Sequence, residues 1–332
     1  VVSMTQSFPS PVPEDLVEQA HHLRKRVENS RMYLHEPHEL SIAAMALPQL
    51  CLRLSIAEDL GTLATHESRN VVRKVSLEDG TLAVLKIVGN VREPGEGELL
   101  SAWYHAGLPC VEPLTWGYHR LPVVEATVSY ILTRFTASLP REIVSSESAR
   151  RREALDLVEF IGPFHRTFTQ VPRARRWADR MRQHLRWTNP RLENAGFALP
   201  LEWEEKLQRL SAEGLVLIHG DPAGSNILRT ENGRLLLDPP GALMALPEAD
   251  VAQICCQVGG LEHVEELIAL AADQNHSVDP SAIAAFAGLN LLVWAGYAVV
   301  HHSNPDVPEA SLGRPEAHMA LAARLLSQFA LS

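Results

Sequence analysis

A short segment with strand character interrupts a long helical stretch in the second half of this 332-residue chain. After Phe135, apolar residues recur at helical spacing almost to the C-terminus, whereas residues 215–238 consist of apolar runs separated by turn residues. Within this segment, Asn232-Gly233 stands between the runs ILR and RLLLD, a pattern typical of a β-hairpin. We therefore predict a helical lobe that carries one β-rich insert.

The polar residues of the insert have a spacing that brings them together. Asn226 and Asp238 lie six residues either side of Asn232, so a simple hairpin register places them opposite each other at the open end. Asp221 precedes Asn226 by five residues, in a turn-rich loop. Two carboxylates and an amide suit Mg²⁺, and phosphoryl transfer needs little beyond positioning, charge neutralisation and an acceptor for the hydroxyl proton.

The first half of the chain has a different pattern. Residues 1–40 are Pro-rich and then charged with helical spacing, and from about Leu54 short β-branched runs follow. A hairpin is predicted at Glu78-Asp79-Gly80, a helix at EGELLSAWYHAGL, and strands at VEPLTWGY and TVSYILTRF. We predict an α+β fold with an N-terminal helical extension (1–40), a small β-rich lobe (41–136) and a mainly helical large lobe (137–332).

The segments HGDPAGSN and LLLDPPGA resemble the His-Gly-Asp, Asn and metal-binding Asp motifs of the aminoglycoside phosphotransferase family. The Asp-Pro-x-Gly ending is most similar to the streptomycin and hydroxyurea kinase branch. A weaker resemblance extends over residues 60–330. Pro222 and Ala223 depart from the family, which usually has Leu or Ile and then His after the aspartate. The resemblance implies a two-lobed eukaryotic-protein-kinase-like fold, with Mg²⁺ and ATP or GTP bound between the lobes.

The resemblance also implies roles for the residues of the insert. Asp221 would be the catalytic aspartate that orients or deprotonates the acceptor hydroxyl, and His219 would brace its loop. Asn226 and Asp238 would bind the metal ion. Asp250 matches a family aspartate that supports the loop from the next helix.

In the small lobe, TLAVLKI resembles the strand that carries the phosphate-binding lysine of kinases. Lys86 would then contact the nucleotide, with Glu96, or alternatively Glu98, as its carboxylate partner. The remaining residues implied at the nucleotide are Ser68 and Asn70 in the covering turn and Thr133 at the adenine hinge.

Charge limits the partners of the chain. The net charge of −10 argues against nucleic acid, because such a partner requires a basic surface. From Arg191 onward there are 18 acidic and 7 basic side chains, which would attract a cationic ligand, although an acidic surface can also serve solubility alone.

Neither a secretory signal nor a membrane span is predicted. The first residues lack a basic flank and an apolar core, and the longest apolar stretch, Leu289 to Val300, is broken by Gly296. The four cysteines have no paired spacing and are expected to be free thiols. These features predict a cytoplasmic protein without membrane partners.

We predict from these features a small-molecule O-phosphotransferase that inactivates an antibiotic, such as an aminoglycoside or another sugar-containing natural product, and confers resistance. Two alternatives remain open: a metabolite kinase acting on an amino sugar or a choline-like alcohol, and a catalytically silent nucleotide-binding protein of kinase fold.

Overall fold

The computed structural model describes residues 38–63, 70–89, 95–139, 146–168, 175–222, 226–237, 243–274, 277–302 and 314–329. Most of the predicted N-terminal extension, Ser68 and Asp238 lie outside these residues. The chain divides into two compact units, one formed by residues 1–92 and 112–136 and the other by residues 93–111 and 137–332.

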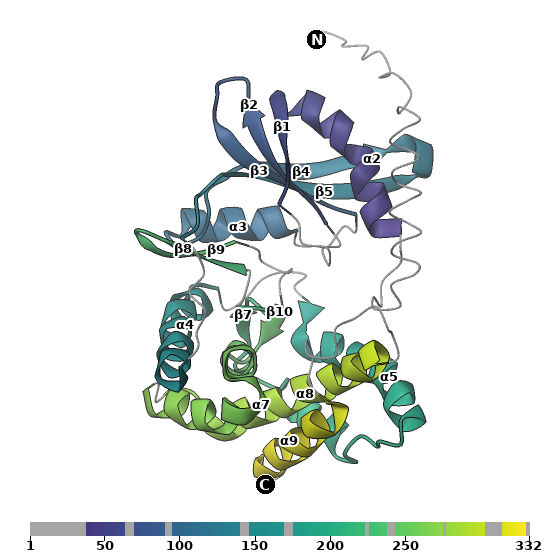
Figure 1. Cartoon of the computed structure of the whole chain (residues 1–332), viewed down its shortest axis with the longest axis vertical. Helices are drawn as coiled ribbons and strands as arrows, with labels where there is room; N and C mark the ends of the chain where they lie inside the picture. The colour runs from purple at the N-terminus through teal and green to yellow at the C-terminus, as the bar shows by residue number, and fades with distance from the viewer. Residues whose placement is uncertain are drawn as a thin grey trace. The chain divides into compact units, whose positions relative to one another are not determined.

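The first unit contains helix α2 and five strands. Their bounds are α2 His38–Arg53, β1 Ile56–Thr62, β2 Val71–Leu77, β3 Leu82–Val88, β4 Pro113–Leu121 and β5 Ala126–Arg134, with a short 3₁₀ turn at Pro122–Val124. The strands form one antiparallel sheet in the order β1-β2-β3-β5-β4. Helix α2 packs against one face of this sheet (Figure 1).

Alternation along β3 fixes which face of the sheet is covered. Ala83, Leu85 and Ile87 are buried in a core that includes Ala43 and Leu50 of α2. Successive side chains of a strand point to opposite faces, so Val84 and Lys86 lie on the face away from α2. The helical pattern of α2 was not predicted from the sequence.

The predicted hairpin at Glu78–Gly80 is confirmed. It joins β2 to β3, and Gly80 takes a positive φ of 80°. The carboxylate of Asp79 accepts a hydrogen bond of 2.8 Å from the backbone N–H of Thr81, which is how Asp commonly stabilises a turn.

The second unit is mainly helical. Its helices are α3 Glu96–His105, α4 Glu147–Thr167, α5 Trp177–Asn194, α6 Trp203–Arg209, α7 Glu248–Gln274, α8 Pro280–His302 and α9 Pro315–Gln328. Its strands are β6 Arg175–Arg176, β7 Val216–Ile218, β8 Ile227–Thr230, β9 Gly233–Leu236 and β10 Leu243–Ala245. They form a three-stranded sheet in the order β6-β10-β7 and the hairpin β8-β9.

Helix α3 belongs to the second unit, whereas the sequence placed it in the small lobe. Trp103 of α3 is 1% exposed and packs edge-on against Phe164 of α4, with ring centroids 5.3 Å apart. The segment after α3 pairs with β9, since Val111 N–H donates to Leu236 O at 3.0 Å. Burial of an aromatic side chain and backbone pairing therefore attach α3 to the helical unit.

Helix α8 is the centre of the second unit, packed against α5, α7 and α9 (Figure 1). Gly296 allows a close crossing with α5, because a Cβ at this position would lie 2.2 Å from Cγ2 of Thr188. Among the described residues, the segment Pro280–Val300 is the one helix long and apolar enough to cross a membrane, and most of it is buried inside the unit. That burial is typical of a core helix.

Helix α7 consists of two helical segments joined at a kink. Gly260 has φ 59° and ψ −171°, which is not helical, and it follows Gly259. A break at adjacent glycines is a common cause of such kinks. The first segment carries Asp250, and the second packs against α4 through polar side chains.

All four cysteines are free thiols, as predicted. Burial raises the pKa of Cys110 and of Cys255 to about 12. These two thiols are therefore protonated and unreactive at neutral pH.

Candidate active site

The loop after β7 carries the His-Gly-Asp sequence, residues 219–221, which we call the His-Gly-Asp loop. Gly220 takes a positive φ of 79°, a conformation that side chains rarely adopt. A Cβ there would also lie 2.7 Å from Cδ1 of Leu243 on the neighbouring strand β10. Both observations explain why glycine occupies the centre of this loop.

Asp250, in the first turn of α7, anchors the backbone of the loop. Its Oδ2 accepts a 2.8 Å hydrogen bond from His219 N–H, and its Oδ1 accepts one of 2.7 Å from Gly220 N–H. His165 of α4 places Nε2 2.8 Å from the same Oδ2. The carboxylate is fully buried. Its position is fixed by these three contacts, two from the His-Gly-Asp loop and one from α4.

The charge state of Asp250 follows from these contacts. Burial by itself raises the pKa of the carboxyl, but the hydrogen bond and charge of His165, together with His219, outweigh it and hold the pKa below its usual value. A buried anion thus sits beneath the loop. Sequence reasoning identified Asp250 but missed His165.

The ring of His219 is held on both sides. Nδ1 lies 3.1 Å from the backbone N–H of Asp221, which donates to it. The ring stacks on Trp103, with centroids 6.2 Å apart and planes 19° from parallel. His219 is 1% exposed, so this geometry gives it the position of a brace inside the loop.

Asp221 presents its carboxylate between two side-chain amides. Nδ2 of Asn226 donates to Oδ2 at 2.8 Å and to the backbone oxygen of Asp221 at 3.0 Å. Nε2 of Gln257, on the first segment of α7, donates to Oδ1 at 2.6 Å. Gln257 was not predicted, because a glutamine on a helix has no distinctive sequence signal. We call the two hydrogen bonds from Asn226 and Gln257 to the Asp221 carboxylate the amide clamp.

The side chain of Asn226 offers an amide oxygen, a type of ligand that Mg²⁺ prefers. Since the amide nitrogen donates to Asp221, the harder amide oxygen is the atom oriented for a cation. The second predicted ligand, Asp238, lies outside the described residues, and only its neighbour Leu237 can be placed.

The register of the β8-β9 hairpin differs from the prediction. Thr230 pairs with Gly233, so the loop is Glu231-Asn232 and Gly233, with φ 117°, begins the return strand. Asn226 is consequently opposite Leu237, whose N–H donates to Asn226 O at 2.8 Å. The predicted register, centred on Asn232 itself, was wrong by one residue because the loop holds two residues.

An ionic contact fixes this hairpin to α4. Glu153 forms a bidentate pair with Arg234 of β9, with both N–O distances 2.9 Å, and it also pairs with Arg229 of β8. These two arginines are cross-strand neighbours. Burial raises the pKa of Glu153, but both arginines outweigh it, so the pKa is lowered. Glu153 therefore offsets the repulsion between these two neighbouring positive charges.

In the first unit, two of the predicted nucleotide-binding residues share a face of the sheet. Lys86 pairs with Ile131, and Thr133 pairs with Val84, so both side chains lie on the face away from α2. Asn70 directly precedes β2, and Ser68 lies outside the described residues. Glu96 is buried in the first turn of α3, in the second unit, whereas Glu98 of the same helix is exposed.

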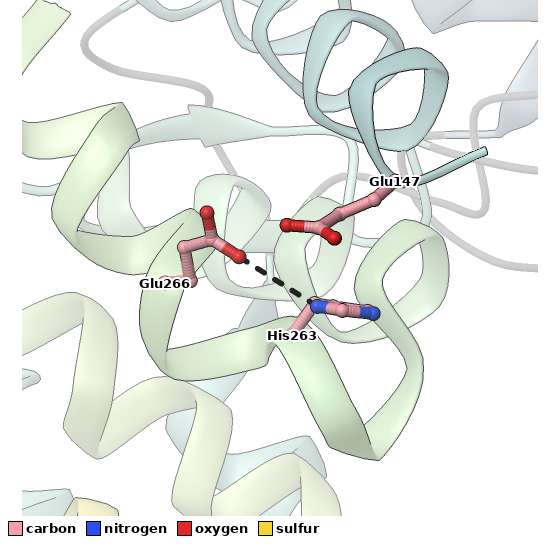
Figure 2. Close-up of side chains that lie close together, drawn as sticks. All are labelled: Glu147, His263 and Glu266. Atoms are coloured by element: carbon pink, nitrogen blue, oxygen red, sulfur yellow. Dashed lines mark ion pairs between the residues drawn. The ribbon is translucent and has the colours of Figure 1, made fainter.

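A second group of potential metal ligands lies between α4 and α7 (Figure 2). Glu147, His263 and Glu266 place one ligand atom each within 4.8 Å of one another. Two arginines occupy the same group: Arg151 pairs with both glutamates, and Arg150 lies 3.2 Å from Nε2 of His263. We interpret it as an ionic contact between the helices, because Arg151 already pairs with both carboxylates.

Two of three comparisons with known proteins gave matches. The family model "Phosphotransferase enzyme family" (APH) matches residues 69–286, which include the His-Gly-Asp loop and the hairpin. A search of curated proteins gave no significant match.

Several solved structures have the same fold. Amicoumacin kinase hAmiN, solved with AMP-PNP, Ca²⁺ and amicoumacin, is 15% identical with a TM-score of 0.59, covering 92% of this chain and 96% of its own. The aminoglycoside phosphotransferase APH(4)-Ia, solved with ADP and hygromycin B, is 14% identical with a TM-score of 0.55. The match covers 86% of this chain and 99% of that protein. A choline/ethanolamine kinase family protein from Mesorhizobium loti is 16% identical with a TM-score of 0.51. The match covers 92% of this chain and 97% of that protein.

The predicted α+β fold of kinase type, with a β-rich small lobe and a helical large lobe, is thereby confirmed. The family model covers well over half of the chain, and the residues it matches include the loop and hairpin described above. The chain belongs to the aminoglycoside phosphotransferase (APH) family of phosphotransferase enzymes.

Proposed function

We propose that this enzyme transfers the γ-phosphoryl group of ATP or GTP to a hydroxyl group of a small molecule, with Asp221 as its catalytic residue. The amide clamp is the observation that carries this proposal. It holds a carboxylate at a loop whose backbone is anchored by Asp250, and it connects that carboxylate to Asn226. A fixed carboxylate next to a metal ligand is what transfer to a hydroxyl requires.

In the proposed reaction the acceptor oxygen attacks the γ-phosphorus, and the bond to the bridging β,γ-oxygen breaks, so that the nucleoside diphosphate leaves. Asp221 orients the acceptor hydroxyl and takes its proton. Lys86 would bind the phosphates, and Asn226 and Asp238 would hold Mg²⁺. When bound, Mg²⁺ neutralises charge on the phosphate oxygens. Dependence on a nucleoside triphosphate is consistent with a cytoplasmic enzyme.

For the acceptor we propose an antibiotic that carries amino groups. Two similar structures support this choice, since one contains amicoumacin and the other hygromycin B. The acidic composition after Arg191 favours a cationic acceptor over an anionic one. Phosphorylation of such a compound would confer resistance.

A second candidate is an amino alcohol of the choline or ethanolamine type. It is favoured by the similarity to the choline/ethanolamine kinase family protein. A quaternary or primary amine on a small alcohol would be attracted by the same charge. The two candidates differ in size, and a direct screen separates them.

The test is a screen of acceptors with Mg²⁺ and either ATP or GTP, read by mass spectrometry of the acceptor. The panel contains aminoglycosides, nucleoside antibiotics, amicoumacin-type compounds, amino sugars, choline and ethanolamine. We expect phosphorylation of an antibiotic by the wild type and its loss in Asp221→Asn. Transfer to choline or ethanolamine alone would favour the second candidate. The absence of any transfer, with Mg²⁺-nucleotide still bound, would indicate a silent nucleotide-binding protein.

A further inference from the structure

We propose that Gln257 is a positioning residue for phosphoryl transfer, holding the carboxylate of Asp221 in its reactive orientation through the N–H donor of its side chain. The contact is the 2.6 Å hydrogen bond from Nε2 of Gln257 to Oδ1 of Asp221. This inference rests on the proposed function, because it assigns to Gln257 an effect on the catalytic residue of that function.

The first support is the position of Gln257 on α7. It lies seven residues after Asp250, and residues seven apart lie on the same face of a helix, about 10 Å apart along its axis. The first segment of α7 therefore touches the His-Gly-Asp loop twice. Asp250 accepts from the backbone of the loop, and Gln257 donates to its catalytic side chain.

The second support is that each oxygen of Asp221 has a different anchor. Oδ2 is held by Asn226, at the start of a hairpin that Glu153 fixes to α4. Oδ1 is held by Gln257, on a helical segment that Asp250 fixes to the loop. Without Gln257, rotation of the carboxylate about its χ angles would be restrained on one side only, and a carboxylate that is partly exposed to water has other rotamers available.

The chemistry of the donor also matters. The side-chain amide holds the carboxylate through a directed N–H donor, and the proposed positioning depends on that donor rather than on the neutrality of the amide. Gln257 is exposed, so packing alone does not account for its position. An exposed glutamine that points at a catalytic carboxylate is expected to act through that carboxylate.

The test compares three substitutions of Gln257 that differ in hydrogen bonding and keep similar length and helix propensity. Gln257→Met removes the donor, Gln257→Glu replaces it with a repelling acceptor, and Gln257→Lys retains an N–H donor. The control is Gln208→Leu, at an exposed glutamine of α6 that carries no site residue. The readouts are the slow hydrolysis of Mg·ATP, with water as acceptor, and the Kd of Mg·ADP by calorimetry.

We expect turnover to fall about 10- to 100-fold in Gln257→Met and further in Gln257→Glu, because misplacement of a reacting group costs rates of this size. Gln257→Lys should recover most of the loss. The Kd of Mg·ADP should remain unchanged in all three, and Gln208→Leu should behave as the wild type. A merely structural role would predict similar values for Met, Glu and Lys.

A double-mutant cycle with Asp221→Asn tests whether Gln257 acts through Asp221. In the Asp221→Asn background, Gln257→Met should cause no further loss. Full turnover in Gln257→Met, an equal loss with all three substitutions, or additive losses in the cycle would each overturn the inference.

The failure of the proposed function has a different signature. A wild type that neither hydrolyses Mg·ATP nor phosphorylates any acceptor would overturn the function. In that case a crystal structure of Gln257→Met with Mg·AMP-PNP still tests the inference. The Asp221 carboxylate should have left the position that it occupies in wild type, and an unmoved carboxylate would overturn the role of Gln257.

Discussion

At the level of single residues, Asp250 combines a fully buried charge with the support of the His-Gly-Asp loop. Three hydrogen bonds converge on its carboxylate, two from backbone N–H groups and one from His165. Asparagine at this position would keep the shape of the side chain. Its NH₂ group, however, would face a backbone N–H donor that now bonds to a carboxylate oxygen. The stability of the unit is therefore tied to the ionised form of one side chain.

We predict that Asp250→Asn lowers the free energy of unfolding by about 3 kcal/mol at neutral pH, as breaking a buried charged contact does. The pKa of Asp250 is lowered in the folded state, so its contribution is fully present above the unfolded value of about 3.9. The contribution disappears as the pH falls through the lower, folded pKa. Urea unfolding between pH 7 and pH 3 measures this.

The difference between wild type and Asp250→Asn should stay constant down to about pH 4 and shrink below it. Asp179→Asn is the control, since Asp179 is exposed and pairs with Arg182 on the surface of α5. It should change stability by less than about 0.5 kcal/mol. A difference that grew on acidification would contradict the assignment.

At the level of elements, the β8-β9 hairpin depends on Glu153. We predict that Glu153→Gln lowers the free energy of unfolding by about 2 kcal/mol, because charge-assisted hydrogen bonds to two arginines weaken and their repulsion is no longer neutralised. Mg²⁺-dependent nucleotide binding should weaken as well, since the hairpin carries Asn226. Calorimetry and urea unfolding test both effects.

The matched control is Glu159→Gln, the same substitution at an exposed position of the same helix. It should leave both quantities within experimental error. Nucleotide binding that was unaffected in Glu153→Gln would show that the hairpin keeps its place without the ionic contact.

The crossing of α5 and α8 gives a second prediction for elements. Gly296→Ala would put a Cβ 2.2 Å from Thr188, so the helices must separate, at a cost of about 1 to 3 kcal/mol. Gly162→Ala in α4 is the control. Its Cβ would meet only the flexible end of Arg166 at 3.3 Å, so we expect no loss, or a gain of about 0.5 kcal/mol from helix propensity. Thermal unfolding of both variants provides the comparison.

The elements also show where sequence reasoning succeeds. The hairpin at Glu78–Gly80 and the end of α3 before Gly107 are set by local turn chemistry, which the sequence contains. The contacts of Asp221 with Asn226 and His219 likewise join residues of one short motif. Such features depend on neighbours in the chain.

Other features depend on the tertiary structure and could not be predicted. The unit to which α3 belongs is decided by the surface that buries Trp103. The hairpin register depends on which residue takes the positive φ, and here it is Gly233, the first residue of the return strand. Gln257 and His165 are ordinary helix residues until the fold brings them to Asp221 and Asp250.

At the level of the whole molecule, the negative charge belongs almost entirely to the second unit. That unit has 27 acidic and 18 basic side chains, a net −9 of the total −10, against 13 and 12 in the first unit. The distribution within it is uneven, since residues 137–190 carry 6 acidic and 11 basic side chains. Attraction of a cation would come from the remainder of the unit.

For an amine-bearing acceptor we therefore predict a KM that rises when salt is increased from about 0.02 to 0.3 M, because screening weakens the attraction. A neutral hydroxyl acceptor, measured in parallel, should show no such change. The measurement is the KM of each acceptor by steady-state kinetics over this range of salt concentration. A salt-independent KM for the amine-bearing compound would remove charge as a reason for its selection.

The kink at Gly260 divides α7 into a segment that supports the His-Gly-Asp loop and one that contacts α4. The second segment begins a new helix, and the first N–H groups of a helix have no partner within it. Hydrogen exchange should therefore report α7 as two protected stretches separated by fast-exchanging amides just after Gly260. Gly260→Ala, which disfavours the positive φ, should alter exchange on both sides of that break. Uniform protection from Glu248 to Gln274 would show that α7 opens as one unit. A change in the contact with α4 would then be transmitted along α7 to the His-Gly-Asp loop.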